Sequence, residues 1–149
     1  MNLESKTNIF IVTDDKPIGF INSLSETQTR NVGYVALFGF NSTYVPSSVT
    51  ITLDVRNVIL STAFTGKIPD LSDPFDVICI YRESKIDCCD FNIVRYKLCQ
   101  FISTQSAYQF GANDLCIESA IINCVSVSSH HGSTKEARRI LRMVMPNGV

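Results

Sequence analysis

The chain has 149 residues, of which 45% are hydrophobic and 18% charged, and its formal net charge is −1. These values exclude a disordered chain and a protein that clamps nucleic acid with its whole surface, and they predict a single domain over 1–149 with a frayed N-terminus at 1–7. No apolar run is long enough for a membrane-spanning helix, and the N-terminus lacks a secretory pattern. We therefore expect an intracellular protein that is soluble or peripherally bound to a membrane.

The first half of the chain predicts strands. Apolar or alternating segments typical of strands lie at 9–13, 18–21, 33–41, 50–56, 58–64 and 76–83. The alternation is clearest at Ile51, Leu53 and Val55, whereas the uninterrupted apolar run at 33–41 predicts a strand buried on both faces. Between the strands, polar residues predict a loop or a helical turn at 23–31, a turn at 42–48 and a loop at 66–74. Asn57 indicates a bulge or a tight turn.

The second half predicts two helices. Asp90 is a good N-cap, and apolar residues recur after it at intervals of three and four, at Phe91, Val94, Leu98, Phe101 and Ile102. We therefore predict a helix at about 90–104, then a loop at 105–114, a strand at 117–128 and a turn at 128–132. A capping box formed by Ser133 and Glu136 precedes the second helix, at about 134–144.

This order of elements predicts an α+β fold. Strands and helices do not alternate regularly, which argues against a parallel sheet with crossover helices. We expect a single domain in which a mostly antiparallel sheet of five to six strands packs against two main helices, at about 90–104 and 134–144.

The cysteines leave three interpretations open. Six are present, at Cys79, Cys88, Cys89, Cys99, Cys116 and Cys124. Most lie in apolar runs, which favours buried free thiols. All of them except Cys79 could form a zinc-stabilised binding module together with His130 and His131, although the usual pair of ligands two to four residues apart is missing. A small enzyme is the other alternative, with a thiol or carboxylate site built from Cys88, Cys89, Asp73 or Asp76. No catalytic motif supports it, and we predict no cofactor, no metal site and no small-molecule substrate.

The helix at 134–144 carries the candidate site. At 100° per residue, one side of this helix presents Lys135, Arg138, Arg139 and Arg142, and the opposite side presents Ala137, Ile140, Leu141 and Val144. The basic side is either a solvated face or a binding site for an anionic membrane surface, RNA or an acidic protein patch.

Composition and this helix together predict a class of function. We expect a non-enzymatic structural or interaction protein that is matrix-like and self-associates as a homo-oligomer. A composition rich in Asn, Ser, Ile and Cys, with few charges, is compatible with a small viral structural or accessory protein.

Overall fold

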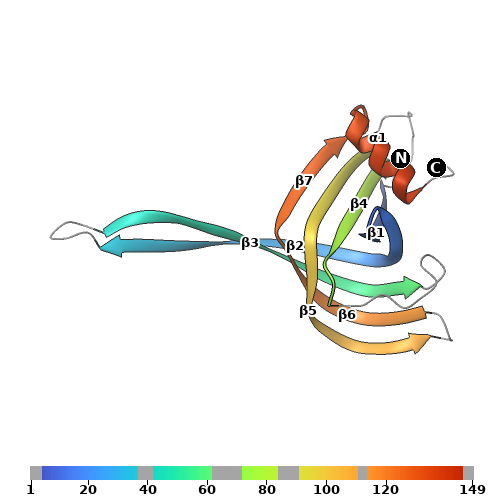
Figure 1. The fold of residues 1–149 in the computed structure, drawn as a ribbon, viewed down its shortest axis with the longest axis horizontal. Helices are drawn as coiled ribbons and strands as arrows, with labels where there is room; N and C mark the ends of the chain where they lie inside the picture. Colours follow the sequence, from blue (N-terminus) through green and yellow to red (C-terminus); the bar gives the residue numbers. More distant parts are fainter. Residues whose placement is uncertain (1–4, 37–41, 62–71, 84–90, 111–113, 146–149) are drawn as a thin grey trace.

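A computed structural model describes residues 5–36, 42–61, 72–83, 91–110 and 114–145. Within these ranges the chain forms strands and one C-terminal helix (Figure 1). The elements are β1 (Ser5–Thr13), β2 (Lys16–Ala36), β3 (Ser42–Ser61), β4 (Phe75–Glu83), β5 (Phe91–Phe110), β6 (Asp114–Cys124), β7 (Ser126–His131) and α1 (Lys135–Val144). Among the described residues, no helix is long and apolar enough to cross a membrane.

The strands form one antiparallel sheet that closes on itself. Their order is β4-β1-β2-β3-β6-β5-β7, and β4 pairs in addition with β5. Strands β1 to β3 form a meander and β4 returns beside β1, which is the Greek-key arrangement. Strands β5 and β6 then fill the space between β4 and β3, and β7 continues along β5 beyond Val125. Closure gives the sheet an inner face and an outer face.

The first hairpin turns at two aspartates. Thr13 pairs with Lys16, so the loop consists of Asp14 and Asp15, whose φ angles are 52° and 60°. Positive φ at both positions is typical of a type I′ turn, whose twist matches that of the flanking strands, and aspartate tolerates this conformation better than most residues.

The inner face forms the main core. Alternate residues of the strands point inward and fill the closed sheet, among them the fully buried Ile11, Leu53, Val55, Val58, Val77, Ile117 and Ile122. A second core lies outside the sheet, where α1 covers Phe10, Val12, Ile78, Ile80, Phe91 and Ile93. Strands β1 and β4 are therefore buried on both faces, which explains their uninterrupted apolar runs.

The predicted fold class is wrong, because the segment 90–104 forms strand β5 and not a helix. The structure is mostly antiparallel sheet with one short helix. Apolar residues recur here at intervals of three and four for two reasons. Strand β5 is buried on both faces in its first part, and the inward and outward alternation of its side chains then shifts at one residue. Before Leu98 both faces of the strand are covered, and at Leu98 a φ of 53° shifts the alternation. Leu98 and Ile102, which a helix would have buried, are 57% and 58% exposed.

Other predicted loops also proved to be strands. The segment 23–31 lies in β2, 42–48 lies in β3, and the predicted turn at 128–132 is mostly β7. Residues 105–110 extend β5 instead of forming a loop. Backbone pairing in long antiparallel strands thus overrode the polar local sequence.

The strands predicted at 9–13, 18–21, 50–56 and 76–83 are confirmed, and 117–128 is strand apart from a break at Val125. Asn57, with a φ of 53°, lies within the continuous β3, so it marks no tight turn. Of 33–41, only the backbone of 33–36 is described, as part of β2, and 62–64 and 66–71 lie outside the described residues. The helix at 134–144 is confirmed as α1.

Gly19 is required by close packing between β2 and β3. A Cβ atom there would lie 2.3 Å from the Ile59 carbonyl oxygen and 2.8 Å from a Leu60 methyl group. We predict that Gly19→Ala lowers the free energy of unfolding by about 1–3 kcal/mol, as overpacking does. Urea denaturation would measure the change, and unaltered stability would show that β3 can move aside.

The strand assignment of β5 can be tested with two matched isoleucines. Ile93 is fully buried under α1 and Ile102 is 58% exposed. Ile93→Ala should lower the unfolding free energy by about 2–5 kcal/mol, and Ile102→Ala should leave it nearly unchanged. A helix at 90–104 packed as first predicted would make Ile102→Ala the costly change, so chemical denaturation of both variants separates the two models.

Candidate functional site

The helix α1 begins at a well-formed cap. Thr134 is the N-cap, and its Oγ1 accepts a hydrogen bond from the Ala137 backbone N–H at 3.2 Å. The same hydroxyl donates to the His131 carbonyl at 2.8 Å, which ties the helix to the end of β7. Ser133, predicted as the cap, instead contacts Nδ1 of His131 through its hydroxyl at 2.9 Å. The cap fixes where the helix starts relative to the sheet.

The apolar side of α1 fixes its rotation. Ala137, Ile140 and Val144 are buried against the outer face of the sheet, and Leu141 is partly buried beside them. All four belong to the apolar stripe predicted from the sequence. Because this stripe is used for packing, the opposite side of the helix must face solvent.

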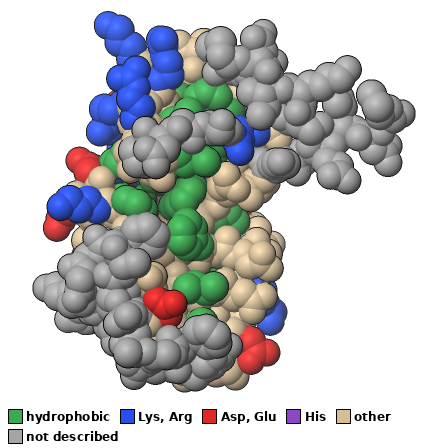
Figure 2. Space-filling model, turned by 90° about the vertical axis from the view of Figure 1, so that its right-hand side faces the viewer, with side chains coloured by type: hydrophobic (Ala, Val, Ile, Leu, Met, Phe, Trp, Pro, Cys, Tyr) green, Lys and Arg blue, Asp and Glu red, His purple; other side chains and the backbone are tan. Residues whose placement is uncertain are grey.

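The predicted site residues all lie on that solvent-facing side. The side chains of Lys135, Arg138, Arg139 and Arg142 are exposed, and we call them the basic face. Figure 2 shows Lys and Arg side chains gathered at the end of the molecule where α1 lies. The structure therefore brings the four cations together within three turns of one helix.

The four cations differ in their partners. Arg139 donates two hydrogen bonds to the Glu136 carboxylate, at 2.7 Å and 3.2 Å, and this contact lowers the pKa of Glu136. Arg138 donates to the backbone carbonyls of Ser133 and Thr134. Within the described part of the chain, Lys135, Arg138 and Arg142 have no carboxylate at ion-pair distance. The basic face thus keeps most of its charge.

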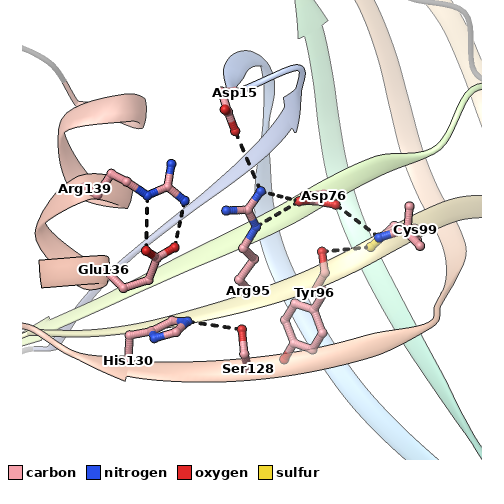
Figure 3. Close-up of polar contacts among 10 residues, drawn as sticks. Asp15, Asp76, Arg95, Tyr96, Cys99, Ser128, His130, Glu136 and Arg139 are labelled. Atoms are coloured by element: carbon pink, nitrogen blue, oxygen red, sulfur yellow. Dashed lines mark hydrogen bonds and ion pairs between the residues drawn. The ribbon is translucent and has the colours of Figure 1, made fainter. Parts of the chain in front are cut away.

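A second ionic group lies beside α1 and was not predicted (Figure 3). The Arg95 guanidinium is 2.6 Å from the Asp76 carboxylate and 3.9 Å from that of Asp15. The other carboxylate oxygen of Asp76 accepts the Leu98 N–H at 3.1 Å, at the residue where β5 changes phase. Asp76 therefore holds the bend of β5. Only the pairing of β4 with β5 brings it to Arg95, so no local pattern could have revealed the contact.

The structure argues against a thiol nucleophile at Cys79 and Cys99. Cys79, Cys99 and Cys124 are buried and free, as expected, and Cys116 is half-buried and free. Burial raises the pKa of the Cys79 thiol to about 11 and raises that of Cys99 further. A reactive cysteine needs the opposite shift.

The remaining candidates of the enzyme and zinc hypotheses do not converge on one site. Cys88 and Cys89 lie outside the described residues, and Asp73 is exposed in a turn. His130 contacts the Ser128 hydroxyl at 3.2 Å. Over the described ranges, no group of three or more His, Cys, Asp or Glu is arranged to hold a metal ion.

Two polar contacts made by tyrosines also escaped prediction. The buried Tyr96 hydroxyl is hydrogen-bonded to the Glu26 carboxylate, and the Tyr81 hydroxyl to the Cys79 thiol. Burial raises the pKa of Tyr81 to about 12, and the pKa of Tyr96 is raised as well. Both hydroxyls stay protonated at neutral pH, although Tyr96 is buried in the core and Tyr81 is 37% exposed.

The buried thiols predict a loss of stability at high pH. The Cys79 pKa is about 11 in the folded state against an ordinary 9.0, so between these values only the unfolded chain releases the proton. Stability is unaffected below pH 9 and falls as the pH rises to 11, by up to roughly 2–3 kcal/mol from this thiol. Urea denaturation from pH 8 to 11 should show a steeper fall for the native chain than for Cys79→Ala. Equal slopes would contradict this effect of burial.

Comparison with known proteins assigns no family. A scan against protein-family models found no match, and a search of curated proteins found no similar sequence. The functional argument therefore depends on the basic face itself.

Proposed function

We propose that this protein is a non-enzymatic structural or interaction protein that binds an anionic membrane surface through the basic face of α1. The observation that carries the proposal is that the two sides of α1 have different surroundings. Its apolar stripe is occupied by the sheet, and its opposite side presents Lys135, Arg138, Arg139 and Arg142 to solvent. A helix whose apolar side is already packed would bind a membrane by charge and not by insertion.

The distribution of charge supports this orientation. The helix carries four basic side chains and one acidic one, whereas the remainder of the chain carries nine basic and thirteen acidic. The molecule is therefore polarised, with a positive end on a body of net negative charge. An anionic plane attracts the helix and repels the body, which favours one orientation at the surface.

Two features favour a membrane over RNA. Residues 135–144 contain no aromatic side chain, so this face offers no platform for base stacking. A long polyanion would also extend past the helix over the negative body, whereas a flat bilayer need contact only the convex helix.

The expected strength is low for a single copy. Lipid-surface contacts contribute about 1 kcal/mol per basic residue, so four cations give about 4 kcal/mol, which corresponds to millimolar affinity. Several linked copies would bind far more tightly because the later contacts are intramolecular. The proposed function therefore requires self-association.

Vesicle binding tests the proposal. The protein should co-sediment with phosphatidylserine-containing vesicles at low salt, less so at 0.5 M salt, and not with phosphatidylcholine vesicles. The triple variant Arg138→Gln, Arg139→Gln, Arg142→Gln should reduce binding at least tenfold, because it removes three of the four cations. Glu136→Gln should strengthen binding, since it releases Arg139 from its ion pair.

A charge-matched control separates the basic face from overall charge. Lys16, Arg56 and Lys97 are exposed and lie in strands, so changing all three to Gln alters the net charge equally. This control should bind vesicles as the native protein does. Equal losses in the two triple variants, or no binding by the native protein, would contradict the proposal, and binding to RNA but not to vesicles would assign the face to RNA.

A further inference from the structure

Strands β2 and β3 form an arm that extends beyond the closed sheet (Figure 1). The pairing of β2 with β1 ends at Ile21, and that of β3 with β6 ends at Ile51. The two strands remain paired with each other as far as Ala36 and Ser42. At a strand rise of about 3.3 Å per residue, residues 29–36 carry the arm roughly 25 Å outward.

The edges of this arm have no partner strand within the described part of the chain. Residues 22–36 of β2 pair only with β3, and residues 42–50 of β3 pair only with β2. Each edge therefore presents a row of backbone N–H and C=O groups that can extend the sheet. A two-stranded ribbon is marginally stable alone in water, and a further strand stabilises it.

The outer part of the arm, beyond Arg30, lacks the usual protection against edge pairing. No charged residue occurs from 31 to 53, although charged side chains are the usual means of blocking exposed edges. Pro46 lies in β3 and cannot donate a backbone hydrogen bond, which weakens that strand's edge. Strand β2 has no proline between 22 and 36. Its edge is therefore the better one for pairing.

Exposed apolar side chains flank the base of the arm. Val49 is 39% exposed, two residues from the end of the β3–β6 pairing, and Val125 is 68% exposed, directly after the β6 residue at that end. The Val125 N–H donates to the Lys97 carbonyl, next to the exposed Leu98. These residues lie on the β3 side of the base, away from the β2 edge, so they do not contribute to pairing through that edge.

We propose that the arm is a self-assembly element, in which residues 29–36 of β2 pair antiparallel with the same residues of a second copy. A two-fold axis makes such a contact self-complementary, and it joins two hairpins into one four-stranded sheet. Arg30 is the one charged residue of this segment, and antiparallel self-pairing places it opposite the uncharged Val35 of the second copy. A second copy is favoured as the occupant because this pairing brings no like charges together and residues 31–36 offer no charge to a charged partner. This inference rests on the proposed function in one respect, because membrane binding there requires more than one copy of the chain. The self-association itself can be measured in solution without membranes.

Molar mass in solution tests the inference directly. Light scattering of the native chain without vesicles should give twice the monomer mass of 16.6 kDa. Arg30 and Val49 pair across the hairpin, so an Asn-Gly turn can replace residues 31–48 and close a shorter hairpin. This shortened variant should have the monomer mass. A native monomer, or a shortened variant that remains dimeric, would overturn the inference.

A charge-swap pair keeps the test valid if the shortened chain fails to fold. Val32 and Tyr34 are alternate residues of β2 within the segment proposed to pair. The double variants Val32→Lys, Tyr34→Lys and Val32→Glu, Tyr34→Glu should each be monomeric alone and should form a dimer when mixed. Absence of the mixed dimer, or dimers of each variant alone, would count against pairing through this edge.

The helix variant distinguishes this inference from the proposed function. Arg138→Gln, Arg139→Gln, Arg142→Gln should keep the dimer mass while losing vesicle binding. The shortened arm variant, which keeps the native charge, should instead bind vesicles as a monomer, at least tenfold more weakly than the native dimer. A change of mass in the helix variant would place the self-association at α1 and overturn the role of the arm.

Discussion

The pairing of β4 with both β1 and β5 is the constraint on which the rest of the structure depends. It closes the sheet, so that alternate side chains of the strands meet inside one core without a second sheet. It also places β1, β4 and β5 next to one another. Each of these strands has apolar residues on both faces, and α1 packs on their outer faces, which form a platform for the helix. Without this closure, neither the inner core nor the seat of α1 would exist.

The platform in turn determines which surfaces are free to act. Because α1 buries Ala137, Ile140 and Val144 on it, the basic face is held outward at one end of the molecule. The arm begins where β2 and β3 leave their neighbours in the closed sheet, and it projects away from α1 (Figure 1). The proposed membrane contact and the proposed self-association thus use different elements, so one dimer could present two basic faces at once.

The error at 90–104 shows how tertiary context can imitate a local pattern. Phe91 and Ile93 face the helix while Tyr96 faces the inner core, so apolar residues occur on both sides of the strand. The left-handed residue Leu98 then shifts the alternation, and the combined spacing equals that of an amphipathic helix. A helix here would have needed a single buried face, whereas the cover on the second face comes from α1, more than thirty residues away along the chain.

The sequence by itself determined the features that depend on neighbouring residues. These are the alternating strand at Ile51–Val55, the stop at Asp14 and Asp15, and the C-terminal helix with its basic and apolar sides, because each is a matter of local periodicity or turn chemistry. Only the tertiary structure decided the closure of the sheet, the Arg95–Asp76 contact and the arm. These features depend on which distant strands pair and where that pairing ends. Strands pair through backbone groups that nearly all residues share, so the local sequence does not identify the partner strand.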